Sequence, residues 1–498
     1  MKNNTIKPSI KSKSLSEILG INTKNIPITN IFDNTFNAKT NGLFIARKGI
    51  QNHGLDFLSK LNEDNVSAII FDERDKERLN NIPKDVFVLP IKDLERKIRN
   101  ITNNFFNYDD SHLKISAITG TNGKTTTCHL VHKAITLMNK ESALIGTLGY
   151  GKEEPYKNTS LTTPNCIELH QIINDLIEQN IEYIALEASS HGLSQNRLSG
   201  INISTAAFTN LTHDHLDYHK DLKEYENSKL MLFNDIDIKK AVINIDNPFG
   251  KRISENIPKS IDKLDVSLEG STKSKPVING TIKQHDSNGL IIDVESDFGK
   301  GQIKSPLTGR FNAQNLLLSL GILLSEGFQL DNIINAFQFI TLPPGRMQSI
   351  NGFGEQKIII DYAHTPDGLE HSLRTIKEIY HGKVCVVFGC GGDRDNKKRP
   401  LMGSMAEKYA DEIIITDDNP RTESSKNIIN DILNGIHDKK RTQTISDRHE
   451  AILYALKASS YNDIVLISGK GHEEKQIYRT KEYDFSDQRC VEEILKIK

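Results

Sequence analysis

The sequence contains no tryptophan, few cysteines and almost no net charge. Its formal net charge of −2 at pH 7 over 498 residues excludes a general electrostatic attraction to nucleic acid or to anionic membranes. An anionic ligand would therefore have to be bound by a local group of side chains. Tryptophan is absent, whereas lysine, asparagine and isoleucine are plentiful. This bias in residue composition reflects the base composition of the genome more than the function of the protein.

The cysteines are odd in number, widely spread and without the paired spacing of a metal site. Only two of them, near the end of one predicted strand, lie close together in the sequence. We expect all of them to be reduced, buried thiols. They are Cys128, Cys166, Cys385, Cys390 and Cys490.

Long apolar runs are also missing. No uninterrupted run approaches the roughly 20 residues that a helix needs to span a bilayer. Residues 1–16 are polar and rich in lysine, which fits neither a signal peptide nor a membrane anchor. We expect a cytoplasmic, monomeric protein that binds neither membranes nor nucleic acid.

The length predicts about three domains at the usual ~150 residues each. Short apolar runs alternate with helical patterns throughout, which is typical of α/β folds with parallel sheets. We expect a small N-terminal α/β domain (1–108), a central doubly wound domain (109–344) and a C-terminal Rossmann-like domain (345–498). The predicted strands are 42–46, 67–71, 86–89, 183–187, 205–209, 241–245, 357–361, 384–389, 412–416 and 464–468.

One stretch has the features of a phosphate-binding loop. In residues 115–127 an apolar strand runs into Thr-Gly-Thr-Asn-Gly-Lys-Thr-Thr-Thr, and helical spacing follows. Gly120 and Gly123 can adopt positive φ and let backbone N–H groups approach an oxyanion at a helix N-terminus. In this interpretation Lys124 reaches the outer phosphates and the Thr125 hydroxyl holds Mg²⁺.

The loop departs from the usual P-loop spacing, since Ile118 stands where the first glycine belongs. The alternative is a structural turn capped by threonines. The strand-loop-helix context favours nucleotide binding.

Two further segments supply candidate metal ligands. Glu187 ends a predicted strand, where it would either ligate Mg²⁺ opposite Thr125 or cap a helix at a solvated strand end. Residues 209–219 contain three histidines and two aspartates. They lack a clean helical histidine pair, so Mg²⁺ suits them better than a transition metal. Lys229 lies on a helical pattern and, taken alone, is most simply a solvated lysine.

The C-terminal third places charged loops after its strands. They are Asp-Tyr-Ala-His-Thr-Pro (361–366), a glycine-rich turn with Arg394 (389–400), Asp-Asn-Pro-Arg (418–421) and Gly-Lys-Gly-His-Glu (469–473). In parallel sheets such loops meet at one edge. Arginines in these loops could bind carboxylates, and acidic residues could bind an ammonium group. The loops therefore indicate a site for a zwitterionic ligand.

Taken together, the motifs resemble the Mur ligases, the ATP-dependent amino-acid ligases of peptidoglycan synthesis, and most closely their MurE-type branch. The resemblance covers essentially the whole chain. Any one motif is weak, whereas nine in family order are specific, and the shortened P-loop is the form this family uses. The motifs are residues 119–126, 161–164, 187–192, 214–219, 309–315, 344–346, 361–366, 418–421 and 469–473.

The resemblance implies an ADP-forming reaction. ATP phosphorylates a terminal carboxylate, an amine attacks the acyl phosphate, and ADP and phosphate are released. It implies catalytic roles for Lys124, Glu187, His215 and a carbamylated Lys229, with Mg²⁺ held by Thr125, Glu187, His215 and Lys229. It implies an ATP site formed by Gly120, Thr121, Asn122, Gly123, Lys124, Thr125, Thr126, Asn312, Asn315, Arg346, Asp361 and His364.

The same resemblance assigns the other substrates, a UDP-muramoyl-dipeptide and an amino acid. The muramoyl-dipeptide would meet Thr162, Thr163, Ser189, Gln195 and Arg197. The amino acid would meet Arg394, Asp418, Asn419, Pro420, Arg421, Gly469 and Glu473. Where the family usually has Asp-Ser-Arg at its uridine site this chain has Asp-Asn-Thr (33–35), so the UDP group would meet Asn34, together with Gln51 and Asn52.

Within the family, Arg421 is the mark of enzymes that add meso-diaminopimelate, because its guanidinium can pair with the distal carboxylate. We therefore expect addition of meso-diaminopimelate to UDP-N-acetylmuramoyl-L-alanyl-D-glutamate. The alternatives are a lysine-adding sister ligase, which would lack this arginine, and a nucleotide-binding regulator without catalysis. A folylpolyglutamate synthetase would share the P-loop but not the Asp-Asn-Pro-Arg loop.

Overall fold

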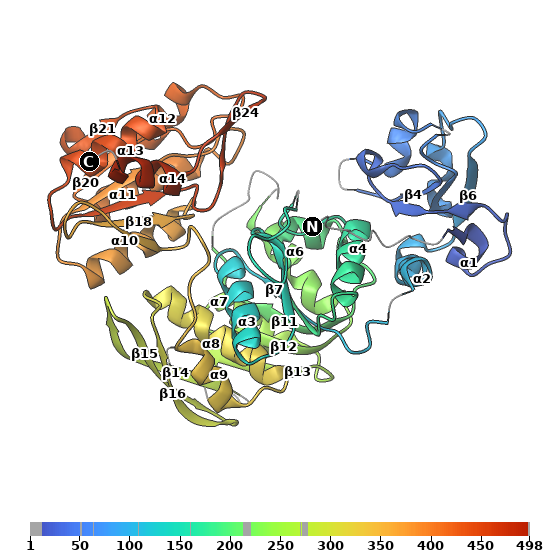
Figure 1. The fold of residues 1–498 in the computed structure, drawn as a ribbon, viewed down its shortest axis with the longest axis horizontal. Helices are drawn as coiled ribbons and strands as arrows, with labels where there is room; N and C mark the ends of the chain where they lie inside the picture. Colours follow the sequence, from blue (N-terminus) through green and yellow to red (C-terminus); the bar gives the residue numbers. More distant parts are fainter. Residues whose placement is uncertain are drawn as a thin grey trace, which may run out of the picture. The chain divides into compact units, whose positions relative to one another are not determined.

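The computed structural model describes residues 12–49, 52–62, 64–107, 109–159, 161–212, 221–268, 270 and 277–496. The chain forms two compact units, each of several segments. The first contains residues 1–117, 141–204 and 231–238, and the second 118–140, 205–230 and 239–498. The predicted α/β class is confirmed, since both units combine helices with largely parallel sheets (Figure 1). The three domain boundaries stay a prediction.

The first unit begins with a four-stranded parallel sheet in the order β3-β4-β5-β6. Alternate strand residues pack on its two faces: Leu43 and Ile45 face helices α1 and α2, whereas Phe44 and Ala46 face the 3₁₀ segment η2. The elements are β1 (Lys13–Ser14), α1 (Leu15–Leu19), β2 (Pro27–Ile28), β3 (Asn30–Phe32), η1 (Thr35–Asn37), β4 (Gly42–Ala46), η2 (Gly54–Lys60), β5 (Ala68–Asp72), η3 (Glu73–Arg78), β6 (Phe87–Ile91) and α2 (Leu94–Phe106).

The same unit contains a second group of strands, in which β8 pairs parallel with β10 and antiparallel with β9. The elements are β8 (Ser142–Gly146), β9 (Gly149–Gly151), α4 (Cys166–Ile177), β10 (Tyr183–Glu187) and α5 (Ser190–Ser194). Residues of both units occur in β7 (Lys114–Thr119), β11 (Ile203–Phe208), α6 (Leu222–Asn234) and β12 (Ile238–Asn244).

In the second unit, β12, β13 and β14 pair in parallel, and β14, β15 and β16 continue as an antiparallel ribbon. This ribbon is not among the predicted strands, although its strands alternate polar and apolar residues around Asn288-Gly289, a hairpin signal. The elements are α3 (Lys124–Leu137), α7 (Pro248–Asn256), β13 (Asp262–Ser267), β14 (Val277–Asp286), β15 (Gly289–Ser296), β16 (Gly299–Ser305), α8 (Arg310–Ser325) and α9 (Leu330–Phe337).

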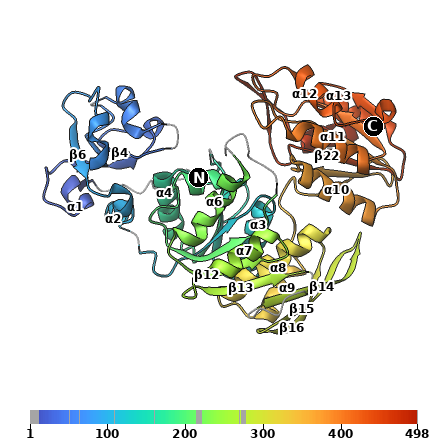
Figure 2. The same ribbon diagram turned by 180° about the vertical axis from the view of Figure 1, so that it is seen from behind.

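The C-terminal part of the second unit is a doubly wound sheet in the order β17-β18-β22-β19-β20-β21, parallel except for β17. One face packs against α10, α11 and α12, and the other against α13 and α14 (Figures 1 and 2). The elements are β17 (Gln348–Asn351), β18 (Lys357–Asp361), α10 (Pro366–Ile379), β19 (Val384–Phe388), α11 (Lys398–Tyr409), β20 (Glu412–Ile415), α12 (Ser425–Leu433), η4 (Lys439–Arg441), β21 (Thr442–Thr444), α13 (Arg448–Ala458), β22 (Ile464–Ser468), β23 (Lys475–Tyr478), β24 (Lys481–Asp484) and α14 (Asp487–Lys496).

Each of the five cysteines is free and buried, as predicted. Burial raises the pKa of the Cys390 thiol to about 12, so this group is an inert part of the core. Among the described residues, no helix combines the length and apolar character needed to cross a membrane.

Two buried histidines predict a loss of stability in mild acid. Burial lowers the pKa of His129 to about 3 and that of His170 to about 4, although each ring contacts a backbone carbonyl. Below the unfolded pKa of about 6.5 the unfolded chain binds a proton that the folded chain does not, so stability falls as the pH drops through this window. At pH 5 each histidine should cost about 2 kcal/mol relative to pH 8.

Denaturant titrations of the wild type and of His129→Gln at pH 8 and pH 5 measure this effect. The stability of the wild type relative to the variant should fall by about 2 kcal/mol between the two pH values. A constant difference would show that His129 binds a proton as readily in the folded protein as in the unfolded chain.

Candidate active site

The phosphate loop lies between a buried strand and a helix, as its sequence predicted. Strand β7 ends at Thr119 and helix α3 begins at Lys124. Gly120 and Gly123 adopt φ of 144° and 87°. A Cβ at Gly120 would lie 1.9 Å from the Thr209 hydroxyl oxygen, and one at Gly123 would lie 2.5 Å from Asn315 Oδ1. Both positions therefore require glycine for conformation and for space.

The residues after β11 hold this loop in place. Asn210 accepts hydrogen bonds from the Thr121 amide through its carbonyl (2.8 Å) and from the Asn122 amide through Oδ1 (2.9 Å). The Thr209 hydroxyl donates to the Asn122 carbonyl at 2.6 Å. The loop conformation is thus preformed by hydrogen bonds within the second unit.

Two lysines converge on the loop. Lys124 Nζ donates to the carbonyls of Gly120 (2.9 Å) and Thr121 (2.8 Å). Lys229 Nζ, from α6, donates to the same Gly120 carbonyl at 2.8 Å and lies 4.2 Å from the centre of the Tyr225 ring. Lys229 is only 1% exposed, so its simplest interpretation from local sequence, a solvated lysine, was wrong.

A cavity of about 260 Å³ adjoins the loop. Its wall contains residues of the loop, of helix α8, of the segment before β17, and of the end of β18 with the residues that follow it. The predicted ATP residues on its wall are Asn122, Gly123, Thr126, Asn312, Asn315, Arg346, Asp361 and His364. Residues of four separate motifs (119–126, 309–315, 344–346 and 361–366) are thereby brought to one site.

Arg346 and Asp361 both line the cavity. The Arg346 guanidinium lies 4.3 Å from the centre of the Tyr362 ring and donates to the Thr125 hydroxyl at 3.3 Å. Asp361 accepts hydrogen bonds from the amides of Met347 (3.2 Å) and Tyr362 (2.9 Å). Burial raises the Asp361 pKa against these hydrogen bonds. A planar cation stacked on an aromatic ring beside a carboxylate is suited to a phosphorylated, ring-containing ligand.

Sequence reasoning missed Asp367 and His371, which also line the cavity. Asn122 Nδ2 donates to Asp367 Oδ2 at 2.9 Å, and His371 Nε2 lies 3.3 Å from Asp367 Oδ1. Burial opposes ionisation of Asp367, yet the contacts from His371 and Asn122 keep its pKa below the usual value, while the hydrogen bond that His371 donates to Asp367 raises the pKa of His371. The signal was present as an Asp-x-x-x-His pair at the start of α10.

In the first unit, Glu187 is buried at the end of β10. Its carboxylate accepts from the Thr147 amide at 2.9 Å and from the Thr147 hydroxyl at 3.2 Å. A Cβ at Gly146 would lie 2.3 Å from Glu187 Oε1, so the glycine makes room for the carboxylate. Glu187 is 1% exposed, which is inconsistent with a solvated strand end.

The residues predicted for the muramoyl-dipeptide form one hydrogen-bonded group beside Glu187. Thr163 Oγ1 donates to the Glu187 carbonyl at 2.6 Å and lies 3.0 Å from Ser189 Oγ. Arg197 donates to the Thr163 carbonyl at 2.7 Å and to Gln195 Oε1 at 2.6 Å. The fifth member, Thr162, contacts the Thr147 hydroxyl at 3.1 Å.

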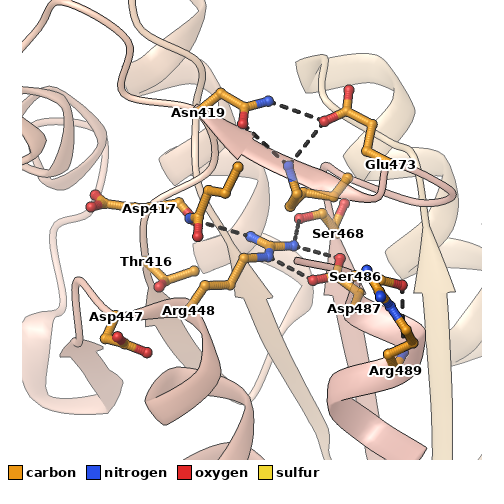
Figure 3. A network of polar contacts seen from close by, with 12 residues as sticks. Thr416, Asp417, Asn419, Asp447, Arg448, Ser468, Glu473, Ser486, Asp487 and Arg489 are labelled. Atoms are coloured by element: carbon orange, nitrogen blue, oxygen red, sulfur yellow. Dashed lines mark hydrogen bonds and ion pairs between the residues drawn. The ribbon is translucent and has the colours of Figure 1, made fainter. Parts of the chain in front are cut away.

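The predicted amino-acid residues lie at the carboxyl edge of the C-terminal sheet. Asn419 Nδ2 donates to Glu473 Oε2 at 3.0 Å (Figure 3). Gly469 has φ 118°, and a Cβ there would lie 2.8 Å from Asp418 Oδ2, so the two loops touch. Arg421 follows Pro420 and donates to the Gly392 carbonyl at 2.8 Å.

Arg394 belongs to the same edge. A Cβ built on Gly391 would lie 3.6 Å from Arg394 Cγ and 2.9 Å from Arg421 Nη1, so both arginines border this glycine. The edge therefore presents two guanidinium groups together with the carboxylates of Asp418 and Glu473.

The uridine residues are less well defined. Asn34 uses its side chain to cap η1 through the Phe36 amide at 3.1 Å, and Asn52 is exposed. Gln51 lies outside the described residues. A polar cavity of about 260 Å³ in the first unit includes the neighbouring Asp33 but neither Asn34 nor Asn52. Their role in binding UDP stays a prediction.

The magnesium ligands also stay a prediction. Thr125 and Lys229 belong to the second unit, Glu187 belongs to the first, and His215 lies outside the described residues. In the part of the chain that the structure describes, no group of three or more histidines, cysteines and acids is arranged to hold a metal ion.

Comparison with family models decides the family. Residues 118–323 match the Mur ligase middle domain, and residues 345–471 match the Mur ligase, glutamate ligase domain. The UDP-N-acetylmuramoyl-L-alanyl-D-glutamate–2,6-diaminopimelate ligase of Buchnera aphidicola subsp. Acyrthosiphon pisum is 38% identical over 95% of this chain and 96% of its own length. The chain belongs to the Mur ligase family.

Other Mur ligases agree along nearly the whole chain. The enzyme of the same name from Coxiella burnetii is 38% identical over 91% of this chain and 92% of its own length. A solved structure with that name covers 98% of this chain and 99% of its own, with 31% identity and a TM-score of 0.68. The predictions of family and fold are confirmed, and the chain is a ligase of this family.

Proposed function

We propose that the protein is the ligase that adds meso-diaminopimelate to UDP-N-acetylmuramoyl-L-alanyl-D-glutamate, with conversion of ATP to ADP and phosphate. The observation that carries the proposal is the carboxyl edge of the C-terminal sheet, where Arg394 and Arg421 border Gly391 and Glu473 bonds to Asn419. A diamino diacid needs partners of both charges, and this edge supplies them. Relatives with 38% identity bear the name of that ligase.

ATP would occupy the cavity beside the phosphate loop. Gly120 to Thr126 would bind the phosphates through backbone N–H groups, with the positive end of α3 directed at them. Arg346, stacked on Tyr362, and the asparagines of α8 would contact the rest of the nucleotide. Lys124 would leave the loop carbonyls for the outer phosphates, because an ammonium gains more from a phosphate oxyanion than from a carbonyl.

The reaction would take place in two steps. The γ-phosphoryl group passes to the terminal carboxylate of the dipeptide, and ADP leaves. The amine of diaminopimelate then attacks the carbonyl carbon of the acyl phosphate, and the tetrahedral intermediate loses phosphate and a proton to give the amide. Positioning and charge neutralisation by Lys124 and Arg346 supply most of the catalysis in such a transfer.

Mg²⁺ fits the donors available. Thr125 offers a hydroxyl and Glu187 a buried carboxylate, and oxygen donors of this kind are the ligands that Mg²⁺ prefers. Carbamylation would convert Lys229 from a cation into an anionic oxygen ligand, and His215 completes the predicted set. Bound Mg²⁺ would neutralise phosphate charge. The substrates are small molecules, and an ATP-consuming reaction fits the predicted cytoplasmic location.

The test is the identity of the product. Purified protein with ATP, Mg²⁺, the UDP-muramoyl-dipeptide and meso-diaminopimelate should yield the UDP-muramoyl-tripeptide by mass spectrometry, with one ADP per product. Formation of a lysine adduct instead would identify the sister ligase. ADP binding with no adduct would identify a nucleotide-binding regulator.

Gly123→Ala should lower kcat/KM for ATP by about 100-fold, because the new Cβ would meet Asn315 Oδ1 at 2.5 Å and displace the first turn of α3. Gly327→Ala is the matched control, since Gly327 has φ 95° against 87° for Gly123 and nothing lies within 4 Å of its Cβ position. Steady-state kinetics should show wild-type ATP parameters for the control. Equal effects of both variants would mean that glycine is required at position 123 because of backbone strain, and not because of the limited space beside Asn315.

A further inference from the structure

One buried arginine supports both loops of the amino-acid site. Arg448 begins helix α13, and its side chain is 0% exposed. Its Nε and Nη2 donate to the two carboxylate oxygens of Asp487 at 2.7 and 2.8 Å. The same guanidinium donates to the Ser468 carbonyl at 3.1 Å and to the Asp417 carbonyl at 3.4 Å (Figure 3). These four hydrogen bonds thus join the guanidinium to one carboxylate and two backbone carbonyls.

The two carbonyls that Arg448 contacts lie at the starts of the two loops of the amino-acid site. Ser468 is the last residue of β22 and directly precedes Gly469, and Asp417 directly precedes Asp418. One rigid guanidinium therefore joins the bases of the 418–421 loop and the 469–473 loop. A planar group with fixed donor directions determines the separation of two such carbonyls better than a flexible ammonium does.

A second set of contacts links the separation of the two loops to the orientation of the Asn419 and Glu473 side chains. Lys470 is also 0% exposed, and its Nζ donates to Asn419 Oδ1 (3.3 Å) and Glu473 Oε2 (3.0 Å). Asn419 Oδ1 accepts from the Ile477 amide at 2.9 Å as well. A shift of one loop against the other would therefore turn Glu473 and Asn419 away from their present orientation.

We propose that Arg448, held by Asp487, is a positioning residue for the amino-acid substrate. It fixes the distance between the 418–421 and 469–473 loops and thereby the orientation of Glu473 and Asn419. It acts through backbone carbonyls and contacts no substrate. The identity of the amino acid rests on the proposed function, whereas the coupling of the loops rests on these contacts alone.

Arg448→Lys and Asp487→Asn test the proposal. The first keeps the charge but cannot make the full set of contacts, and the second is isosteric and loosens the guanidinium. Each should raise KM for the amino acid about 10- to 100-fold and leave KM for ATP and for the UDP-muramoyl-dipeptide unchanged, because only the loops move. Hydrogen exchange should become faster in the two loops and stay slow in strands β18, β19 and β22.

Arg441→Lys is the matched control. Arg441 also donates to two backbone carbonyls, those of Glu407 and Ala410, but they lie at the end of α11, just before the start of β20 and away from the strand-end loops. This variant should keep the wild-type KM for all substrates. Thermal unfolding of each variant establishes the folded fraction.

KM for the amino acid decides the outcome. If Arg448→Lys and Asp487→Asn give less folded enzyme with an unchanged KM, Arg448 is only structural and the inference is wrong. If the wild type itself incorporates no amino acid, the proposed function fails, and the hydrogen exchange of the loops still tests their coupling.

Discussion

Replacing Lys124 by methionine should reduce kcat about 1,000-fold with little change in KM for the UDP-muramoyl-dipeptide. Methionine preserves the length and much of the volume of the side chain but removes the charge that the transferred phosphoryl group requires. The contacts of Lys124 Nζ with the carbonyls of Gly120 and Thr121 place this charge at the mouth of the phosphate loop. Steady-state ADP release is the measurement.

Lys133→Met is the control for this prediction. Lys133 lies on the same helix, about 13.5 Å further along its axis from Lys124 at 1.5 Å per residue. It should keep wild-type turnover. A Lys124→Met enzyme within threefold of the wild type would show that the loop does not hold the reacting phosphates.

Arg421→Ala should lower kcat/KM for meso-diaminopimelate by 100-fold or more, with KM for ATP unchanged. The guanidinium is the proposed partner of the distal carboxylate, and its removal leaves that carboxylate without a bidentate donor. The Arg421 side chain is already directed to the Gly392 carbonyl, at 2.8 Å, within the glycine-rich turn. Competition assays with L-lysine should show that discrimination between the two amino acids collapses.

Arg479→Ala is a close control for Arg421→Ala. Arg479 has φ 55° against 52° for Arg421, so both substitutions place alanine in the same strained backbone region. Arg479 is exposed and lies at the turn between β23 and β24. The Arg479 amide donates to the Arg421 carbonyl at 2.6 Å, so this variant also shows how far a disturbed backbone at Arg421 affects specificity. Retention of diaminopimelate specificity by Arg421→Ala would contradict the assignment.

The parts of the fold that could be predicted are those determined by neighbours in the sequence. Strands β4, β10, β18 and β22 have the predicted bounds, because each is a short apolar run buried on both faces and ended by polar residues. The phosphate loop was also predictable, because its strand, its glycines and its helix are neighbours in the sequence. The ribbon β14–β16 lacks the continuous apolar runs by which the other strands were predicted, because its strands are only partly buried.

The site was less predictable where contacts join distant residues. Asn122 and Asp367 are 245 residues apart in the sequence, and no local pattern pairs them. Lys229 has the local sequence of a solvated lysine, yet the fold brings its ammonium to the Gly120 carbonyl, 109 residues away. Arg448 likewise contacts the backbone carbonyls of Asp417 and Ser468. Any residue type offers a carbonyl, so the side chains at these two positions give no sign of the contact.

The most direct test of the central claim is phosphate release by the purified protein with ATP, Mg²⁺ and the UDP-muramoyl-dipeptide, with meso-diaminopimelate or L-lysine added in parallel. We expect release only with diaminopimelate, because Arg421 and Arg394 provide for a second carboxylate that lysine lacks. Release with lysine alone would contradict the assigned specificity while leaving a ligase. No phosphate release with either amino acid would contradict the proposed ligase activity.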